Sequence, residues 1–136
     1  MTRSPIFIGS TSEKDRATRI GIARISVGSV VLLTTRQAQQ LFGLPDEQDS
    51  AATRLLARLF GIRNITLGAW ALAVRDRSKA ERKLCYQFNA AVDAADLVVL
   101  AVAGIMRQGL TRPVIMSSVL GSSALLAWLD LLDDVG

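Results

Sequence analysis

The amino-acid sequence predicts an all-α protein, a four-transmembrane-helix bundle with both termini in the cytoplasm. Half of the 136 residues are hydrophobic. Charged side chains gather in short stretches, and the apolar segments between them have about 20 residues, the length that crosses a hydrocarbon core. At this length the chain forms one domain. Residues 1–16 are predicted as a charged N-terminal tail, residues 17–131 as the membrane domain, and residues 132–136 as a short acidic C-terminal tail.

The first predicted helix covers residues 17–35, which are mostly apolar and end at a polar segment. In this segment Gly43 and Pro45 interrupt helical structure, and Ser50 is a residue type that caps the start of a helix. The second predicted helix therefore covers residues 51–74. It carries arginines in its first half and becomes a continuous apolar run toward its end.

The third predicted helix covers residues 84–106 and follows the most basic segment of the chain. The fourth covers residues 113–129, contains no charged residue and begins with Pro113, which suits the first turn of a helix. With a rise of about 1.5 Å per residue, all four segments are long enough to span a bilayer. The alternative is a soluble bundle, but the fourth segment lacks the polar outer face that this would need.

Basic residues mark one side of the predicted membrane domain. Nine lysines and arginines lie before or in the first turn of the first helix or between the second and third, whereas four lie beside the opposite ends of the spans. The positive-inside rule then places both termini and the central connection in the cytoplasm. The N-terminal segment has no long apolar core and is not expected to be a cleaved secretory signal.

The composition excludes several classes of site. There is no histidine and only one cysteine, so Cys/His zinc sites, histidine-ligated haem, catalytic triads and internal disulfides are excluded. No metal and no cofactor are expected, and Cys85 is interpreted as a small buried residue. A net charge of +4 does not indicate a nucleic-acid partner, because the arginines alternate with apolar runs.

Ionisable side chains inside the second and third predicted helices are the first candidates for a functional site. Arg63 lies about 18 Å into its helix, and Asp93 and Asp96 lie about 13 to 18 Å into theirs. The depths coincide. If these two helices are antiparallel neighbours, Arg63 pairs with Asp93 and Arg58 pairs with Asp96.

Two amides are available to extend these ion pairs by hydrogen bonding. Arg24, in the first helix, is instead expected to extend toward Asp130 or toward lipid headgroups. The complete predicted polar centre, which is the candidate ligand site, consists of Arg58, Arg63, Asn64, Asn89, Asp93 and Asp96. Asp93 and Asp96 are also the candidate catalytic residues, since they lie three positions apart on one helix face.

Two interpretations of this centre remain open at the level of sequence. An ionised side chain at mid-bilayer costs roughly 2.5 to 3.5 kcal/mol, so four of them must pair inside the bundle. The pairs either fix the register of the helices or form a substrate pocket, proton relay or ion path.

Small residues are placed where helices can approach closely, and they favour a hairpin of the first two helices followed by a hairpin of the last two. These residues are Gly21 with Gly28, Ala57 with Gly61, Ala90 with Ala94, and Ser117 with Gly121.

Two sequence motifs carry a family resemblance. LARLFGIRNITLGAWAL has an arginine on each side of a Phe-Gly step, and VDAADLVVL follows one helix later. Together they resemble an uncharacterised group of small four-helix bacterial integral membrane proteins near the DoxX-like families, over roughly residues 17–130. The resemblance implies the four-helix fold, a bacterial cytoplasmic membrane, and importance for Arg58, Arg63, Asp93 and Asp96.

Three functions are compatible with these observations. The first is a multi-pass protein that binds a lipid-soluble ligand or serves as an accessory subunit of a larger membrane complex. The second is a membrane enzyme that uses its carboxylates as acid and base on an isoprenoid, quinone or epoxide-like substrate. The third is a proton-coupled transporter, which would require a homodimer because four helices enclose a narrow lumen. In all three, the lipid bilayer is the immediate partner.

Overall fold

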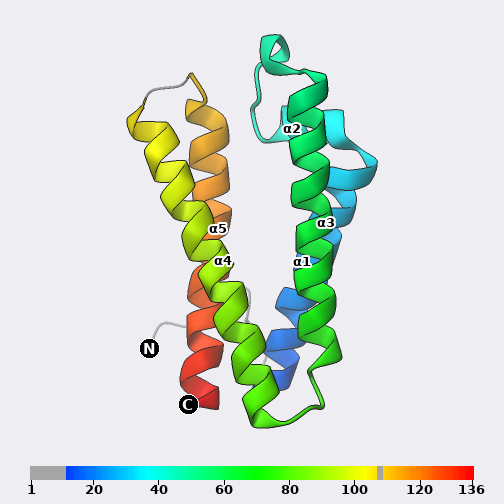
Figure 1. The fold of residues 1–136 in the computed structure, drawn as a ribbon, viewed down its shortest axis with the longest axis vertical. Coiled ribbons are helices and arrows are strands. Elements are labelled where there is room, and N and C mark those ends of the chain that lie inside the picture. Colours follow the sequence, from blue (N-terminus) through cyan, green and yellow to red (C-terminus); the bar gives the residue numbers. More distant parts are fainter. Residues whose placement is uncertain (1–11, 107–108) are drawn as a thin grey trace.

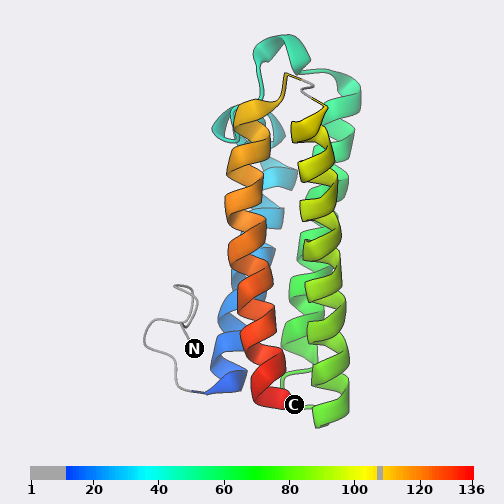
Figure 2. The ribbon, with the colours of Figure 1, turned by 90° about the vertical axis from the view of Figure 1, so that its left-hand side faces the viewer.

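In the computed structural model, residues 12–106 and 109–136 are described, and the regular structure within them is entirely helical. Four long helices run along one axis (Figures 1 and 2). The elements in chain order are α1 (Glu13–Leu33), α2 (Thr35–Leu41), the 3-10 turn η2 (Asp46–Gln48), α3 (Ala51–Ala73), α4 (Lys79–Ile105) and α5 (Thr111–Val135). The predicted all-α class is therefore confirmed.

The ends of the chain differ from the predicted tails. Residues 1–11 of the predicted N-terminal tail lie outside the described residues, but α1 already begins at Glu13. At the other end α5 continues to Val135, so most of the predicted acidic tail is helical. Leu131 and Val135 are buried there, which explains why the helix does not stop at Leu129 as predicted.

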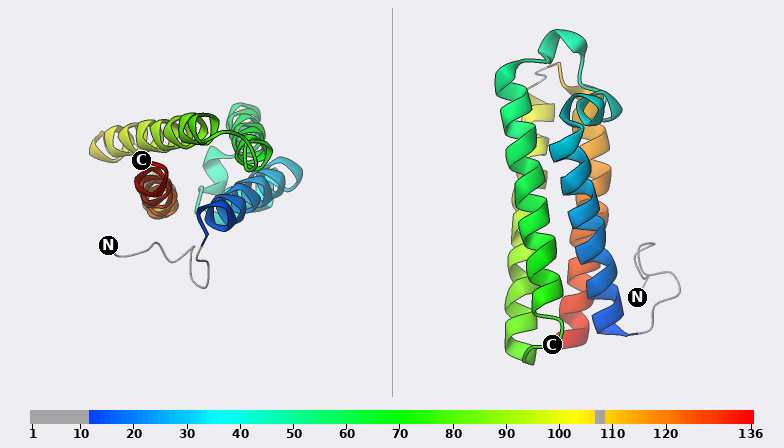
Figure 3. Two further views of the ribbon diagram at one scale, coloured as in Figure 1. Left: turned by 90° about the horizontal axis from the view of Figure 1, so that it is seen from below. Right: turned by 90° about the vertical axis from the view of Figure 1, so that its right-hand side faces the viewer.

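The four long helices are organised as two antiparallel pairs. α1 packs along α3, and α4 packs along α5, while contacts between the two pairs are sparse (Figures 1 and 3). This is the predicted order of hairpins. The start of α1, the connection between α3 and α4, and the C-terminus lie at the same end of the molecule (Figure 2).

Glycines bring the backbones of α1 and α3 into direct contact. A Cβ atom built on Gly28 would lie 2.5 Å from the carbonyl oxygen of Gly61, and one built on Gly68 would lie 2.5 Å from that of Gly21. Real Cβ atoms do not approach a backbone oxygen so closely, so each position requires glycine. Such contacts between small residues are typical of helix pairs in membranes, where close packing replaces the hydrophobic effect.

The largest cluster of buried apolar side chains lies in the half of the bundle that contains the C-terminus. Its largest fully buried side chains include Trp128, Tyr86, Ile20 and Leu131, which come from three different helices. At this end the two pairs are also joined by polar contacts. Glu13 accepts hydrogen bonds from Tyr86 and from Arg82, the latter at 3.3 Å.

Two helices have the length and apolar composition to cross a membrane, namely α4 and α5. The pair α1 and α2 passes the same test together, which gives up to three spans within the described residues, although this pair is bent by 114°. Large apolar side chains on the outer surface are strongly exposed, such as Val98 at 64% and Ile105 at 80%. These features suggest a membrane protein. The two or three spans identified by length and composition do not confirm the four that the sequence predicts.

The sequence did not predict α2, since its polar residues were assigned to a connection. The chain bends at Thr34 and Thr35, whose hydroxyls donate to the carbonyls of Val30 (2.6 Å) and Val31 (2.9 Å). These bonds satisfy the last carbonyls of α1 and let the chain turn into a new helix. α2 therefore lies at the end of the bundle away from the C-terminus (Figure 1).

The start of α4 is set by a capping box. The Ser78 hydroxyl accepts from the backbone N–H of Glu81 (3.3 Å), and the Glu81 carboxylate accepts from the backbone N–H of Ser78 (3.1 Å). These bonds satisfy donors that a helix start would otherwise leave open. They explain why α4 begins at Lys79 rather than at Leu84 as predicted.

Replacing Ser78 with alanine is expected to lower the free energy of unfolding by about 1 kcal/mol, because the cap of α4 is lost. The measurement is helical circular dichroism during titration with a denaturing detergent. Ser122→Ala, at an exposed position within α5, is the matched control. Equal stability of the S78A and S122A proteins would contradict the prediction.

Candidate functional site

A cavity of about 400 Å³ lies between the two helix pairs, lined by residues from all four long helices. Its volume falls within the range of about 300–1,000 Å³ that is typical of small-molecule sites. Most of its wall is apolar. The polar exceptions form one cluster and are Arg24 from α1, Arg63 and Asn64 from α3, and Asp93 and Asp96 from α4, with Ser117 from α5 further along.

Arg24 joins three helices within this cluster. One terminal nitrogen of its guanidinium forms an ion pair with Asp93, and the other donates to the side-chain oxygen of Asn64 at 2.8 Å. The Asn64 amide in turn donates to the carbonyl of Phe60 (3.0 Å). The side chains of Arg24 and Asp93 are each only 7% exposed, so the pair is removed from both water and lipid.

Arg63 and Asp96 form a second ion pair, between α3 and α4. It is bidentate, with one nitrogen–oxygen distance of 3.0 Å. These side chains are 39% and 33% exposed, so the pair lies at the mouth of the cluster. The guanidinium also lies over the ring of Phe60, 5.3 Å from its centroid. Paired planar geometry of this kind fixes both side chains more firmly than a single contact.

Trp128 lies where this cluster meets the apolar core. The Arg24 guanidinium lies 5.7 Å from the centroid of the Trp128 ring, and the ring packs against Tyr86 at a centroid distance of 5.8 Å. A cation over an indole is a favourable contact. The cavity therefore has a floor of ion pairs backed by aromatic side chains.

The two predicted ion pairs are wrong. Arg63 pairs with Asp96 instead of Asp93, and Asp93 pairs with Arg24. The prediction assumed that α3 and α4 pack closely along their length, whereas each packs mainly against another helix. Their register is consequently displaced by one turn. The predicted approach of Arg24 to Asp130 or to headgroups is also wrong, since its guanidinium is turned into the bundle.

Two of the predicted site residues lie apart from the cluster. Arg58 is exposed on α3. Asn89 is fully buried in the apolar core, where its amide donates to the carbonyl of Cys85, one turn earlier on the same helix (3.0 Å). The other four predicted site residues lie together in one cluster on the cavity wall, namely Arg63, Asn64, Asp93 and Asp96.

Arg24 is the residue that sequence reasoning missed. The sequence nevertheless contains a pattern that indicates this contact. α1 and α4 run parallel, so oppositely charged residues that face each other across them are separated by a constant number of positions. Arg24 and Asp93 are 69 positions apart, and so are Glu13 and Arg82. A search for parallel helices as well as antiparallel neighbours would have found both contacts.

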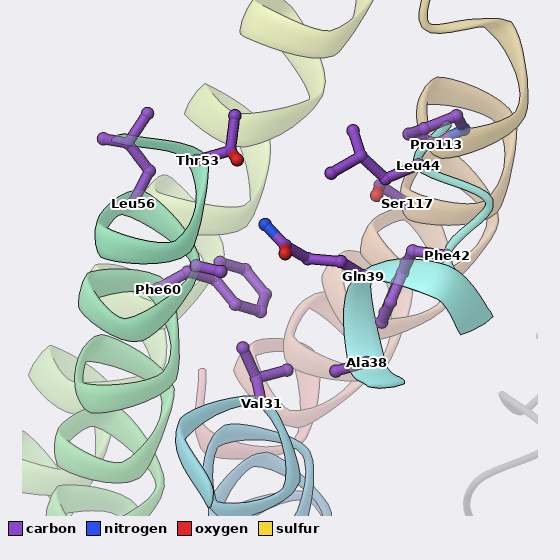
Figure 4. A pocket seen from close by; sticks show the side chains of 11 residues that line it. Val31, Ala38, Gln39, Phe42, Leu44, Thr53, Leu56, Phe60, Pro113 and Ser117 are labelled. Atoms are coloured by element: carbon purple, nitrogen blue, oxygen red, sulfur yellow. The ribbon is translucent and has the colours of Figure 1, made fainter. Parts of the chain in front are cut away.

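A second cavity of about 270 Å³ lies beyond the first, toward α2. The two cavities share three lining residues, Phe42, Phe60 and Ser117. Figure 4 shows the Gln39 side chain of α2 extending into this second cavity, between Phe60 and Ser117. The side-chain amide oxygen Oε1 of Gln39 is buried and has no hydrogen-bond partner among the described residues.

Within residues 12–106 and 109–136, no group of three or more histidine, cysteine, aspartate or glutamate side chains is arranged to hold a metal ion. The model of the family described as "Domain of unknown function (DUF4267)" matches residues 21–129, a range that includes the whole polar cluster. No curated protein and no solved structure matches the chain.

Proposed function

The chain belongs to the DUF4267 family, and we propose that it binds a lipid-soluble small molecule in the cavity between its two helix pairs. One observation carries this proposal. A cluster of two arginines, two aspartates and an asparagine lies on the wall of an otherwise apolar cavity of about 400 Å³. Ligand sites combine apolar walls with a few convergent polar groups in this way.

The ion pairs leave hydrogen-bonding capacity for a ligand. The Nε atoms of Arg24 and Arg63 are buried and have no hydrogen-bond partner among the described residues. A buried donor without a partner costs about 1–3 kcal/mol. A ligand oxygen that accepts from these atoms would remove this cost. If the bound molecule is also a substrate, Asp93 and Asp96 are the groups that could exchange protons with it.

We also propose a topology of four spans, with both termini on the cytoplasmic side of a bacterial membrane. α3 has 23 residues, enough for a span, and its Arg63 is neutralised by Asp96. The connection between α3 and α4 is basic and lies at the same end as the C-terminus, which supports a common cytoplasmic side (Figure 2). A kinship with DoxX-like proteins, as the sequence motifs suggest, agrees with this arrangement.

Filling the cavity tests the proposed binding. Ala124 lines the cavity, and Ala124→Phe should reduce the fraction of protein that retains a bound small molecule at least about 10-fold, which corresponds to about 1.4 kcal/mol. Native mass spectrometry of the full chain in a mild detergent measures this fraction. The matched control is Leu126→Phe, at a 58% exposed position of the same helix. Retention of the same molecule at the same level by the A124F protein would refute the proposed site.

A further inference from the structure

We propose that the ligand is an uncharged amphiphile, with a hydrogen-bonding head at the Arg24–Asp93 and Arg63–Asp96 pairs and a chain that extends into the second cavity beneath α2. This inference rests on the proposed binding function and adds the chemical class and the length of the ligand.

The charge of the site favours a neutral head. Each arginine of the cluster is paired with an aspartate, so the cluster carries no net charge. Among residues 12–106 and 109–136, no other charged residue lines either cavity. A carboxylate, phosphate or ammonium head would therefore be buried without a counter-ion, unless it broke one of the existing pairs. Burial of an unpaired charge is far more costly than burial of a hydroxyl or carbonyl that finds a hydrogen bond.

The chemistry of the head follows from the groups that lack partners. The Nε–H groups of Arg24 and Arg63 are donors, and arginine has no acceptor. Asp93 Oδ2 is a buried acceptor that also lacks a partner among the described residues. The ligand must therefore both accept and donate hydrogen bonds, as an alcohol or a primary amide does. An alcohol can at the same time donate to one of the neighbouring carboxylates.

The direction of the chain follows from the position of the second cavity. The floor of the first cavity is closed by Trp128 and the apolar core, so a chain can extend only toward α2 or out into lipid. Phe42, Phe60 and Ser117 line both cavities and make the wall continuous. From Arg63 to Thr53, which lines the far cavity, α3 covers ten residues, or about 15 Å.

An ion-pair cluster fixes the far end of this space. Asp49 accepts two hydrogen bonds from Arg54 at the start of α3 (2.7 and 2.6 Å), and Arg36 of α2 lies 3.8 Å from the same carboxylate. The hydrogen bonds from Arg54 hold the pKa of Asp49 below its ordinary value, so the cluster stays ionised near neutral pH. α2 is thereby tied to the start of α3 beside the second cavity.

The head group is tested with three probes of equal chain length: dodecan-1-ol, dodecanoate and dodecyltrimethylammonium. The full chain is placed in lipid nanodiscs, and the fluorescence of Trp128 is followed in a Trp70→Phe background, so that Trp128 is the sole tryptophan. We expect dodecan-1-ol to saturate the signal at a concentration at least about 10-fold lower than either charged probe. Equal or tighter binding of dodecanoate or of the ammonium compound would overturn the neutral head, as would recovery of only anionic phospholipid from the purified protein.

The length of the chain is tested with octan-1-ol and dodecan-1-ol. Ala57 lines only the second cavity, and Ala57→Phe should weaken dodecan-1-ol binding at least about 10-fold and leave octan-1-ol binding unchanged. Ala52→Phe, at an exposed position of α3, is the control, and Leu56→Phe is a second narrowing variant if the A57F protein loses helicity. Equal effects on both alcohols would overturn the assignment of the chain to the second cavity. If neither alcohol gives a saturable signal in the unmodified protein, the proposed binding function itself fails.

Discussion

Replacing Asp93 with leucine is expected to lower the free energy of unfolding by about 3–5 kcal/mol, because it leaves the Arg24 guanidinium buried without its counter-ion. Both side chains of this pair are only 7% exposed, and Arg24 would retain only its contacts with Asn64 and Trp128. Titration with a denaturing detergent, followed by circular dichroism, measures the loss. Asp133→Leu, at an exposed position near the end of α5, removes the same charge outside the cluster and serves as the control.

A double substitution separates the structural role of this pair from its role in binding. Arg24→Met combined with Asp93→Leu removes both charges and should recover most of the lost stability, since a buried ion pair is often no more stabilising than apolar side chains of similar volume. The same double variant should bind dodecan-1-ol more weakly, because it removes one of the two ion pairs that form the head-group site. A double variant no more stable than D93L would show that the loss does not come from the unpaired arginine.

Replacing Gly61 with leucine is expected to separate α1 from α3 and to lower the free energy of unfolding by about 3 kcal/mol or more. A Cβ at this position would lie 2.7 Å from the carbonyl oxygen of Gly28 and 3.2 Å from the backbone nitrogen of Leu32. Backbone atoms cannot rotate away as a side chain does, so the two helices must move apart. The readout is the yield of folded protein and its detergent-titration midpoint.

The matched control for this substitution is Gly104→Leu in α4. A Cβ on Gly104 would meet only a side-chain atom of Val114, at the ordinary contact distance of 3.5 Å. The G104L protein should therefore keep the stability of the unmodified chain. If G61L were equally stable, the close glycine contact would not hold the first helix pair together.

Much of the fold could be predicted because the long helices are continuous apolar segments. The predicted range 51–74 agrees with α3, and the order of the two hairpins is correct. The remaining errors have local causes. Hydropathy does not detect the capping box at Ser78 or the buried last turns of α5. It also assigns the polar residues of α2 to a connection, although the hydroxyls of Thr34 and Thr35 allow a new helix to begin there.

The site was less predictable than the fold, because it depends on which helices face one another. Depth along a helix correctly grouped Arg63, Asp93 and Asp96 at one level of the bundle. The depth of a residue along its helix does not determine which residue it pairs with. Arg24 lies at the same level on α1, which runs parallel to α4, and it is Arg24 that pairs with Asp93. The cavity itself has no signature in the sequence, because it results from loose packing between pairs that are each tightly packed.

The division of charge between the two helix pairs has a consequence for biosynthesis. Both arginines of the cluster belong to the first pair, and both aspartates belong to α4. During translation Arg24 emerges from the ribosome 69 residues before Asp93, a delay of seconds at roughly 5–20 residues per second. If the four-span topology proposed above is correct, a first hairpin released early into lipid would carry two uncompensated cations. The order of synthesis therefore favours a translocon that retains the first hairpin until α4 arrives to neutralise it.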